Sequence, residues 1–233
     1  MNPADEAAAS LDRRTATIDL VAATRTLMHA AATSDLPADD LAEETKAIQD
    51  VASRLARRSR PRVLRIPFEL PGSIRAQGPD AVWQTYELNP FGIPLQVRFD
   101  GDSSHGTFVA DGLHEGPPDS LHGGWSAHLM DCMLGGLVQA TGAMSVTATL
   151  DLRYRHKVPL ERRVDLLAEI TGRSGRKIRA QGRIEVDGIV CVEARGLFVR
   201  VDGGSADQEA APGAAAPTAA APTAATTDEL SPR

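Results

Sequence analysis

A long apolar helix with a single carboxylate is the feature that most constrains this chain. Hydrophobic residues dominate from about Gly124 to Ala140, where Asp131 is the only Asp, Glu, Lys or Arg. A helix that is apolar on nearly all sides has to be covered by other elements. At about 100° per residue, the small and polar positions fall on one narrow stripe: Gly124, His128, Asp131, Gly135 and Gln139.

Two interpretations of this stripe are open: the solvent-facing side of the helix, or the wall of a functional site. A solvated helix face usually carries Lys, Glu or Arg, and this stripe has none. It also contains glycine, which lowers helix stability by about 1 kcal/mol per residue relative to Ala. These features favour a site wall with Asp131 in it.

Strand patterns on both sides of the helix predict the sheet that covers it. LQVRFDG and the residues around Thr107 to Ala110 indicate two short strands before the helix. After it, SVTATLDLRYRH alternates with a period of two, which places Thr147 on the face opposite Leu150. Three more strand-like segments follow, with turns at Ser174-Gly175 and Asp187-Gly188. We therefore expect an α+β domain whose last four strands form an antiparallel meander.

The two ends of the chain are expected to be extensions of this domain. Residues 11 to 58 are typical of two helices, followed by a connector with Pro61, Pro67 and Pro71. From Gly203 the chain is rich in Ala, Pro and Thr without periodicity, which predicts disorder. The expected organisation is a helical extension and connector at 1–80, the main domain at 81–202 and a disordered tail at 203–233.

Composition excludes several classes of function. A formal net charge of -6 argues against a nucleic-acid-binding surface, and no apolar run has the roughly 18 residues of a membrane span. The N-terminal residues do not resemble a signal peptide, so we expect a cytoplasmic protein. The two cysteines, Cys132 and Cys191, are expected to be small buried hydrophobic residues. No metal site and no cofactor are predicted.

The N-terminus of the apolar helix is suited to bind negative charge. Unpaired backbone N–H groups are expected at Gly123, Gly124 and Trp125, where they can stabilise a developing oxyanion. Asp131 is the candidate base, but it lies eight residues after Gly123, about 12 Å along a helix. One carbonyl cannot contact both groups of the same helix. Either they do not cooperate, or a second copy in an isologous dimer supplies one of them.

The segment EGPPDSLHGGWSAHLMD followed by SVTATLDLRYRHKVPL resembles hotdog-fold acyl-CoA thioesterases of the PaaI-like group. Its motif is similar to that of the subgroup with Glu-Gly-Pro-Pro-x-x-x-His-Gly-Gly, and the resemblance covers roughly residues 85 to 201. It implies a sheet wrapped around a central helix, and dimers or dimers of dimers with their sheets side by side. The family's oxyanion donor matches the N–H of Gly123. Its acid, a base or a nucleophile on the opposite subunit, matches Asp131.

The resemblance also implies that Thr147 holds the attacking water. Some relatives use an Asn six residues before the motif histidine to orient this water, and here that position is Gly116. This departure, shared with the subgroup, affects mechanistic detail more than activity. For Thr147, an ordinary strand residue is the alternative interpretation.

Other candidate residues each have a structural interpretation beside the functional one. His122 is a proton donor or a cap that orients the loop. Gly124 and His128 are candidate substrate contacts because they lie on the stripe. Arg176 and Lys177, with Arg173 and Arg179 nearby, either bind the phosphates of coenzyme A or form a solvated hairpin edge.

The sequence therefore predicts an acyl-CoA thioesterase that hydrolyses a fatty or aryl acyl-CoA to the free acid and CoA. A non-catalytic acyl-CoA-binding or regulatory hotdog protein, with the helical extension engaging a partner, is the alternative. A hydratase on the same fold would require a His and carboxylate arrangement that we do not find in the sequence.

Overall fold

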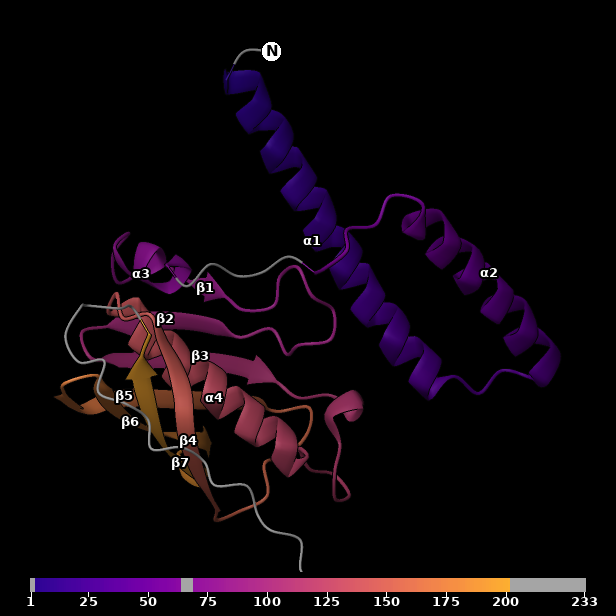
Figure 1. The fold of residues 1–233 in the computed structure, drawn as a ribbon. Helices are drawn as coiled ribbons and strands as arrows, with labels where there is room; N and C mark the ends of the chain where they lie inside the picture. The colour runs from indigo at the N-terminus through magenta and orange to yellow at the C-terminus, as the bar shows by residue number, and fades with distance from the viewer. Residues whose placement is uncertain (1–2, 64–68, 202–233) are drawn as a thin grey trace, which may run out of the picture. The chain divides into compact units, whose positions relative to one another are not determined.

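The computed structural model describes residues 3–63 and 69–201 (Figure 1). It begins with two helices, α1 (Pro3–Thr33) and α2 (Ala38–Ala56), which confirm the helical prediction for residues 11 to 58. No residue of α2 is buried. Within the described ranges, no helix is both long and apolar enough to cross a membrane. The tail predicted to be disordered, 203–233, lies outside the described residues, as does Pro67 of the connector.

The centre of the fold is an antiparallel sheet in the order β1-β2-β3-β5-β6-β7-β4 (Figure 1). Its strands are β1 (Trp83–Gln84), β2 (Gln96–Asp100), β3 (Ser103–Val109), β4 (Ser145–Tyr154), β5 (Arg163–Ser174), β6 (Lys177–Val186) and β7 (Ile189–Arg200). The turn between β6 and β7 has Asp187 at φ 51° and Gly188 at φ 78°. Two successive residues with positive φ form the turn type that matches the twist of a hairpin.

The predicted meander of four strands is wrong in the position of β4. Strands β5, β6 and β7 do form a meander, but β5 pairs with β3, and β4 pairs with β7 at the edge of the sheet. Between β3 and β4 the chain forms the long helix α4 (Gly123–Ala140). Helix α4 contacts every strand from β2 to β7, so it crosses the sheet. Strand β4, which follows the helix, therefore joins the sheet beside β7 and not beside β3.

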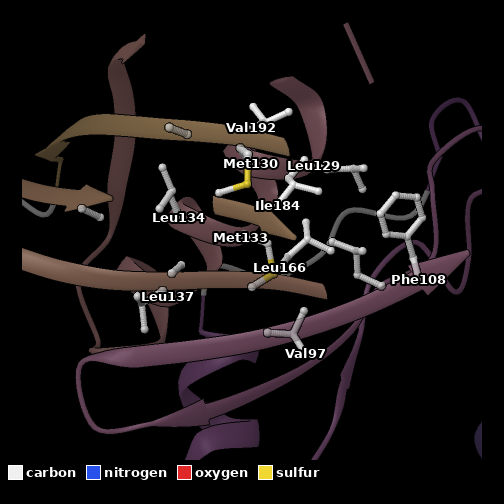
Figure 2. Packing of buried hydrophobic residues seen from close by; sticks show 14 of the residues in the cluster. Val97, Phe108, Leu129, Met130, Met133, Leu134, Leu137, Leu166, Ile184 and Val192 are labelled. Atoms are coloured by element: carbon white, nitrogen blue, oxygen red, sulfur yellow. The ribbon is translucent and has the colours of Figure 1, made fainter. Parts of the chain in front are cut away.

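Helix α4 supplies one side of the hydrophobic core, as its composition predicts. Figure 2 shows Leu129, Met130, Met133, Leu134 and Leu137 of α4 among Val97, Leu166, Ile184 and Val192 of the strands. Asp131, Gly135 and Gln139 of the predicted stripe are all only partly buried. The stripe is therefore the open side of an otherwise buried helix.

Three short elements were missed by the sequence patterns. Pro71, predicted to be part of the connector, lies in the first turn of α3 (Leu70–Arg75), where its missing N–H is not needed. Strand β1 has two residues and pairs Trp83 with Val97. A single 3₁₀ turn, η1 (Gly112–His114), precedes α4. All three are too short to show a hydrophobic period.

A β-bulge in β4 changes which side chains face α4. The pairing of β4 with β7 shifts between Thr147 and Thr149, so that Ala148 is the extra residue. The regular alternation predicted from the sequence put Thr147 and Leu150 on opposite faces. In the structure Leu150 packs against the core and Thr147 contacts α4, so both lie on the inner face. The bulge is thus what directs Thr147 toward the helix.

Two adjacent glycines of α4 are expected to respond to alanine in opposite directions. A Cβ on Gly136 would lie 2.3 Å from the buried ring of Trp83, whereas one on Gly135 would lie 3.6 Å from Phe198, an ordinary contact. Gly136→Ala should lower the free energy of unfolding by about 1–3 kcal/mol through overpacking. Gly135→Ala should raise it by up to about 1 kcal/mol through helix propensity. Urea unfolding of both variants measures the difference, and shifts of the same sign would contradict this packing.

Candidate active site

Asp131 and Thr147 form a direct side-chain pair between α4 and β4. The hydroxyl of Thr147 donates a hydrogen bond of 2.8 Å to Oδ1 of Asp131. The other carboxylate oxygen has no hydrogen-bond partner among the described residues. The pair therefore presents one free carboxylate oxygen beside a hydroxyl that can still accept a hydrogen bond. This arrangement can hold a water molecule and take a proton from it.

The N–H groups at the start of α4 are not all unpaired, which corrects the expectation from the sequence. The N–H of Gly124 donates to Nδ1 of His122 at 3.0 Å, and that of Trp125 donates to the carbonyl of His122 at 2.9 Å. The N–H of Gly123 has no acceptor among the described residues. His122 thus acts as the N-cap, and Gly123 carries the free donor at the positive end of the helix.

Tyr154 contacts the same end of α4 and was not identified from the sequence. Its hydroxyl donates a hydrogen bond of 2.9 Å to the carbonyl of Gly123, and its ring would lie 3.4 Å from a Cβ at that position. Strand β4 therefore contacts α4 at both candidate positions, through Thr147 at Asp131 and through Tyr154 at Gly123. This hydrogen bond from Tyr154 holds the peptide group between Gly123 and Gly124, next to the free N–H of Gly123.

The two candidate half-sites lie at separate positions along one helix. Gly123 begins α4 and Asp131 follows eight residues later, about 12 Å along the axis. Among the described residues, strand β4 has only one neighbour in the sheet, and it exposes 48% of Val146 and 57% of Tyr154. An unpaired strand edge beside both half-sites fits a surface that another chain completes.

Aromatic side chains cover α4 between the two half-sites. The half-buried ring of His128 lies 5.7 Å from Trp125 and 5.4 Å from Tyr86, and Phe91 lies 5.7 Å from Trp125. Burial lowers the pKa of His128, and nearby Asp131 partly offsets this effect. His128 is therefore a neutral ring in an apolar wall near pH 7. The chain has only two tyrosines, and both contact this part of α4. Their scarcity is the one sequence signal that could have marked them as candidate site residues.

The thiol of Cys132 belongs to the same wall. Its sulfur lies 3.5 Å from the hydroxyl of Tyr86 and 3.9 Å from Nε2 of His128. Burial raises the pKa of Cys132 to about 11, and burial also raises the pKa of the Tyr86 phenol. Both groups are therefore protonated at neutral pH, and Asp131 is the one carboxylate on this stretch of the helix.

The basic residues proposed for phosphate binding are partly occupied by contacts within the chain. Arg176 donates to the carbonyl of Arg200 at 2.8 and 3.1 Å, and Arg173 forms a two-point pair with Asp102. Lys177 is exposed at the start of β6. Its neighbour Ile178 pairs with Phe198, which also pairs with Thr147. The backbone of Lys177 thus lies at the end of the sheet where Asp131 and Thr147 meet, but its side chain alternates with buried Ile178 and faces the outer side of the sheet.

A separate hollow lies away from these residues. It is on the outer face of the sheet, among charged residues such as Arg98, His105 and Arg183, and includes none of the candidate catalytic residues. Residues of opposite charge lie along this face. The candidate catalytic residues instead lie between α4 and β4.

A single long helix with an antiparallel sheet around it is the hotdog fold, and solved structures agree. A crystal structure of a thioesterase superfamily protein matches with a TM-score of 0.67 and 29% identity, covering 78% of this chain and 94% of that one. Residues 81–233 make up less than 78% of the chain, so the matched part must include some of the N-terminal extension. No protein-family model matches the chain.

Weaker likenesses are confined to about half of the chain. A thioesterase superfamily protein from Shewanella loihica PV-4 has a TM-score of 0.41 and 24% identity, covering 46% of this chain and 90% of that one. The E. coli PaaI protein from the phenylacetic acid degradation operon has a TM-score of 0.44 and 14% identity, covering 46% and 82%. The match at a TM-score of 0.67, with the first thioesterase superfamily protein, supports a hotdog fold for this chain.

Proposed function

We propose that the protein is an acyl-CoA thioesterase that hydrolyses an acyl-CoA to the free acid and CoA. The observation that carries the proposal is the pair of Thr147 and Asp131, joined by a hydrogen bond of 2.8 Å on the open side of α4. A carboxylate with one oxygen fixed and the other free is suited to general-base catalysis. The resemblance of the surrounding motif to PaaI-like thioesterases supports the same reaction.

The proposed reaction begins with a water held between Thr147 and Asp131. Asp131 takes a proton from this water as its oxygen attacks the thioester carbonyl, and the resulting oxyanion binds the N–H of Gly123. The tetrahedral intermediate then releases the CoA sulfur, which takes the proton back from Asp131, and the free acid remains. Direct attack by Asp131 on the carbonyl is the alternative first step.

Each site needs two subunits in this mechanism. Gly123 and Asp131 of one helix are too far apart to act on one carbonyl, so Asp131 of one subunit has to meet Gly123 of another. The unpaired edge of β4 supports such an arrangement because it carries Thr147 and Tyr154. We therefore propose a homodimer, or a dimer of dimers, with two identical composite sites per dimer. Lys177 is the remaining candidate for a CoA phosphate contact.

The alternative is a non-catalytic acyl-CoA-binding protein whose helical extension engages a partner. One observation favours it: α2 exposes a row of apolar side chains, comprising Leu41, Ile48, Val51 and Leu55. Residues of this kind are usually covered in a working assembly. This surface favours a protein partner for α2, and it does not bear on the reaction at Asp131.

A panel of acyl-CoAs with a free-thiol reagent distinguishes the two functions. We expect the wild-type protein to release CoA thiol from at least one member of an acetyl-, hexanoyl- and benzoyl-CoA panel. Each binding affinity is measured by calorimetry in parallel. Tight binding without thiol release would exclude the thioesterase and favour the regulatory protein.

A further inference from the structure

Helix α1 holds a loop of the main domain through one arginine. The terminal nitrogen Nη2 of Arg25 donates to the carbonyls of Tyr86, Asn89 and Gly92 at 2.5, 2.8 and 3.4 Å. Its Nε is buried without a hydrogen-bond partner among the described residues. All the polar contacts of this guanidinium therefore go to one segment, residues 86–92.

Neighbouring residues of α1 contribute to the same contact. Arg14 forms an ion pair with Glu87 of this segment, and Val21 is buried although most of the described side chains of α1 are exposed. Val21 lies between Arg14 and Arg25 at spacings of seven and four residues, so the three share one face of the helix. That face is the side on which α1 contacts the main domain.

The 86–92 loop is closed at its base and strained within. The hydroxyl of Thr85 donates to the carbonyl of Ile93 at 3.1 Å and accepts from the N–H of Leu95 at 2.8 Å. Tyr86 has a φ of 53°, a conformation that bulky side chains rarely adopt. Gly92 packs directly under its ring, where a Cβ would lie 2.1 Å away. Such a conformation persists only where surrounding contacts hold it, and Arg25 binds the carbonyl of Tyr86 itself.

The loop places two aromatic rings on the open side of α4. The hydroxyl of Tyr86 reaches Cys132, next to Asp131, and the ring of Phe91 packs on Trp125, close to Gly123. Phe91 remains 72% exposed, so this apolar surface is open to a bound molecule. An apolar wall beside both reacting groups is where the acyl part of a thioester can be buried.

We propose that α1 is part of the acyl-binding site: Arg25 fixes the 86–92 loop, which in turn fixes Tyr86 and Phe91 as the wall that selects the acyl group. Arg25 is a positioning residue and does not touch the substrate. The inference rests on the proposed thioesterase function. The match of part of the N-terminal extension to a solved thioesterase superfamily structure is consistent with a role inside the domain.

The first test asks whether Arg25 holds the loop, independently of activity. Arg25→Ala should speed hydrogen exchange of the amides in residues 84–95 by about tenfold or more, because the loop then loses the contacts that mainly restrain it from opening. Arg25→Lys should be intermediate, since the lysine ammonium can donate to the same carbonyls but its side chain is one bond shorter and reaches them less fully. Arg13→Ala is the matched control, an exposed arginine of α1 whose side chain has no polar contact in the described structure.

The second test asks whether the loop selects the acyl group. In Arg25→Ala, we expect KM for hexanoyl- and benzoyl-CoA to rise about tenfold, with little change for acetyl-CoA and with kcat within about threefold of wild type. A merely destabilised protein would lose activity equally with all three. Phe91→Ala should reproduce the pattern without touching α1, and the double variant should show no more than the larger single effect, since both act through one wall.

Unchanged exchange in Arg25→Ala, or a KM that rises equally for all acyl groups, would overturn the inference. Additive effects of Arg25→Ala and Phe91→Ala would also count against it. Failure of the proposed function looks different, because the wild-type protein would then release no thiol from any acyl-CoA. Normal wild-type turnover with unaltered selectivity in Arg25→Ala leaves the thioesterase intact and removes only the role of α1.

Discussion

Asp131→Asn is expected to lower the thioesterase rate at least about a hundredfold, the scale of a lost general base. The amide has the same shape as the carboxylate, and its oxygen can still accept the hydrogen bond that Thr147 donates. The variant should therefore fold and assemble like the wild type while lacking a group that accepts the proton of water. Thiol release at saturating acyl-CoA measures the loss.

Asp151→Asn is the matched control for this prediction. Asp151 lies on β4, between Leu150 and Leu152 that pack on the core, so its side chain faces the outer surface of the sheet. Its substitution removes the same charge from the strand that carries Thr147, and the rate should stay within about twofold. Wild-type turnover in Asp131→Asn would show that this carboxylate is not the base.

Gly123→Pro is expected to lower kcat by about a hundredfold to a thousandfold, the usual effect of losing one oxyanion donor. Proline removes the N–H, which has no acceptor within the described chain, and it is well tolerated at the first position of a helix. The preceding residue, His122, has φ -62° and ψ 136°, which suits a residue before proline. Gly123 is thus one of the few backbone donors that can be deleted without disturbing its surroundings.

Gly123→Ala separates the lost donor from the added side chain. Alanine keeps the N–H and places its Cβ 3.4 Å from the ring of Tyr154, as proline does. We expect this variant to retain most of the wild-type rate. Equal losses in the alanine and proline variants would assign the effect to crowding against Tyr154 and would contradict a role for the N–H.

The same two variants test the composite site. In a heterodimer of Asp131→Asn and Gly123→Pro subunits, one of the two sites receives an intact Gly123 from one chain and an intact Asp131 from the other. Equal co-expression gives heterodimers as half of the dimers, so about a quarter of the wild-type activity should return. If both groups act within one subunit, the mixture stays as inactive as its parents.

Much of the fold could be predicted from local patterns. The apolar run from Gly124 to Ala140 requires a covered helix, and the structure places α4 within one residue of these limits. The turn at Asp187-Gly188 follows from residues that accept positive φ. Asp131 on the open stripe follows from the helical period alone. These features depend on neighbours within a few residues, and the sequence contains that information directly.

Other features depend on which distant segments meet. The edge position of β4 results from the path of α4 across the sheet, and no pattern within β4 encodes it. The bulge at Ala148 has no signature in a regular alternation, yet it brings Thr147 to Asp131. The sequence placed three free N–H groups at the start of α4, whereas the ring and carbonyl of His122 occupy two of them and leave Gly123.

The sequence by itself therefore determined the elements, the helix stripe and the candidate acid, because each is a property of a local period or turn. Only the tertiary structure decided the pairing of Thr147 with Asp131, the contact of Tyr154 with Gly123 and the hold of Arg25 on the Tyr86 loop. Arg25 precedes Tyr86 by 61 residues, and a contact over such a separation depends on packing that no short pattern records.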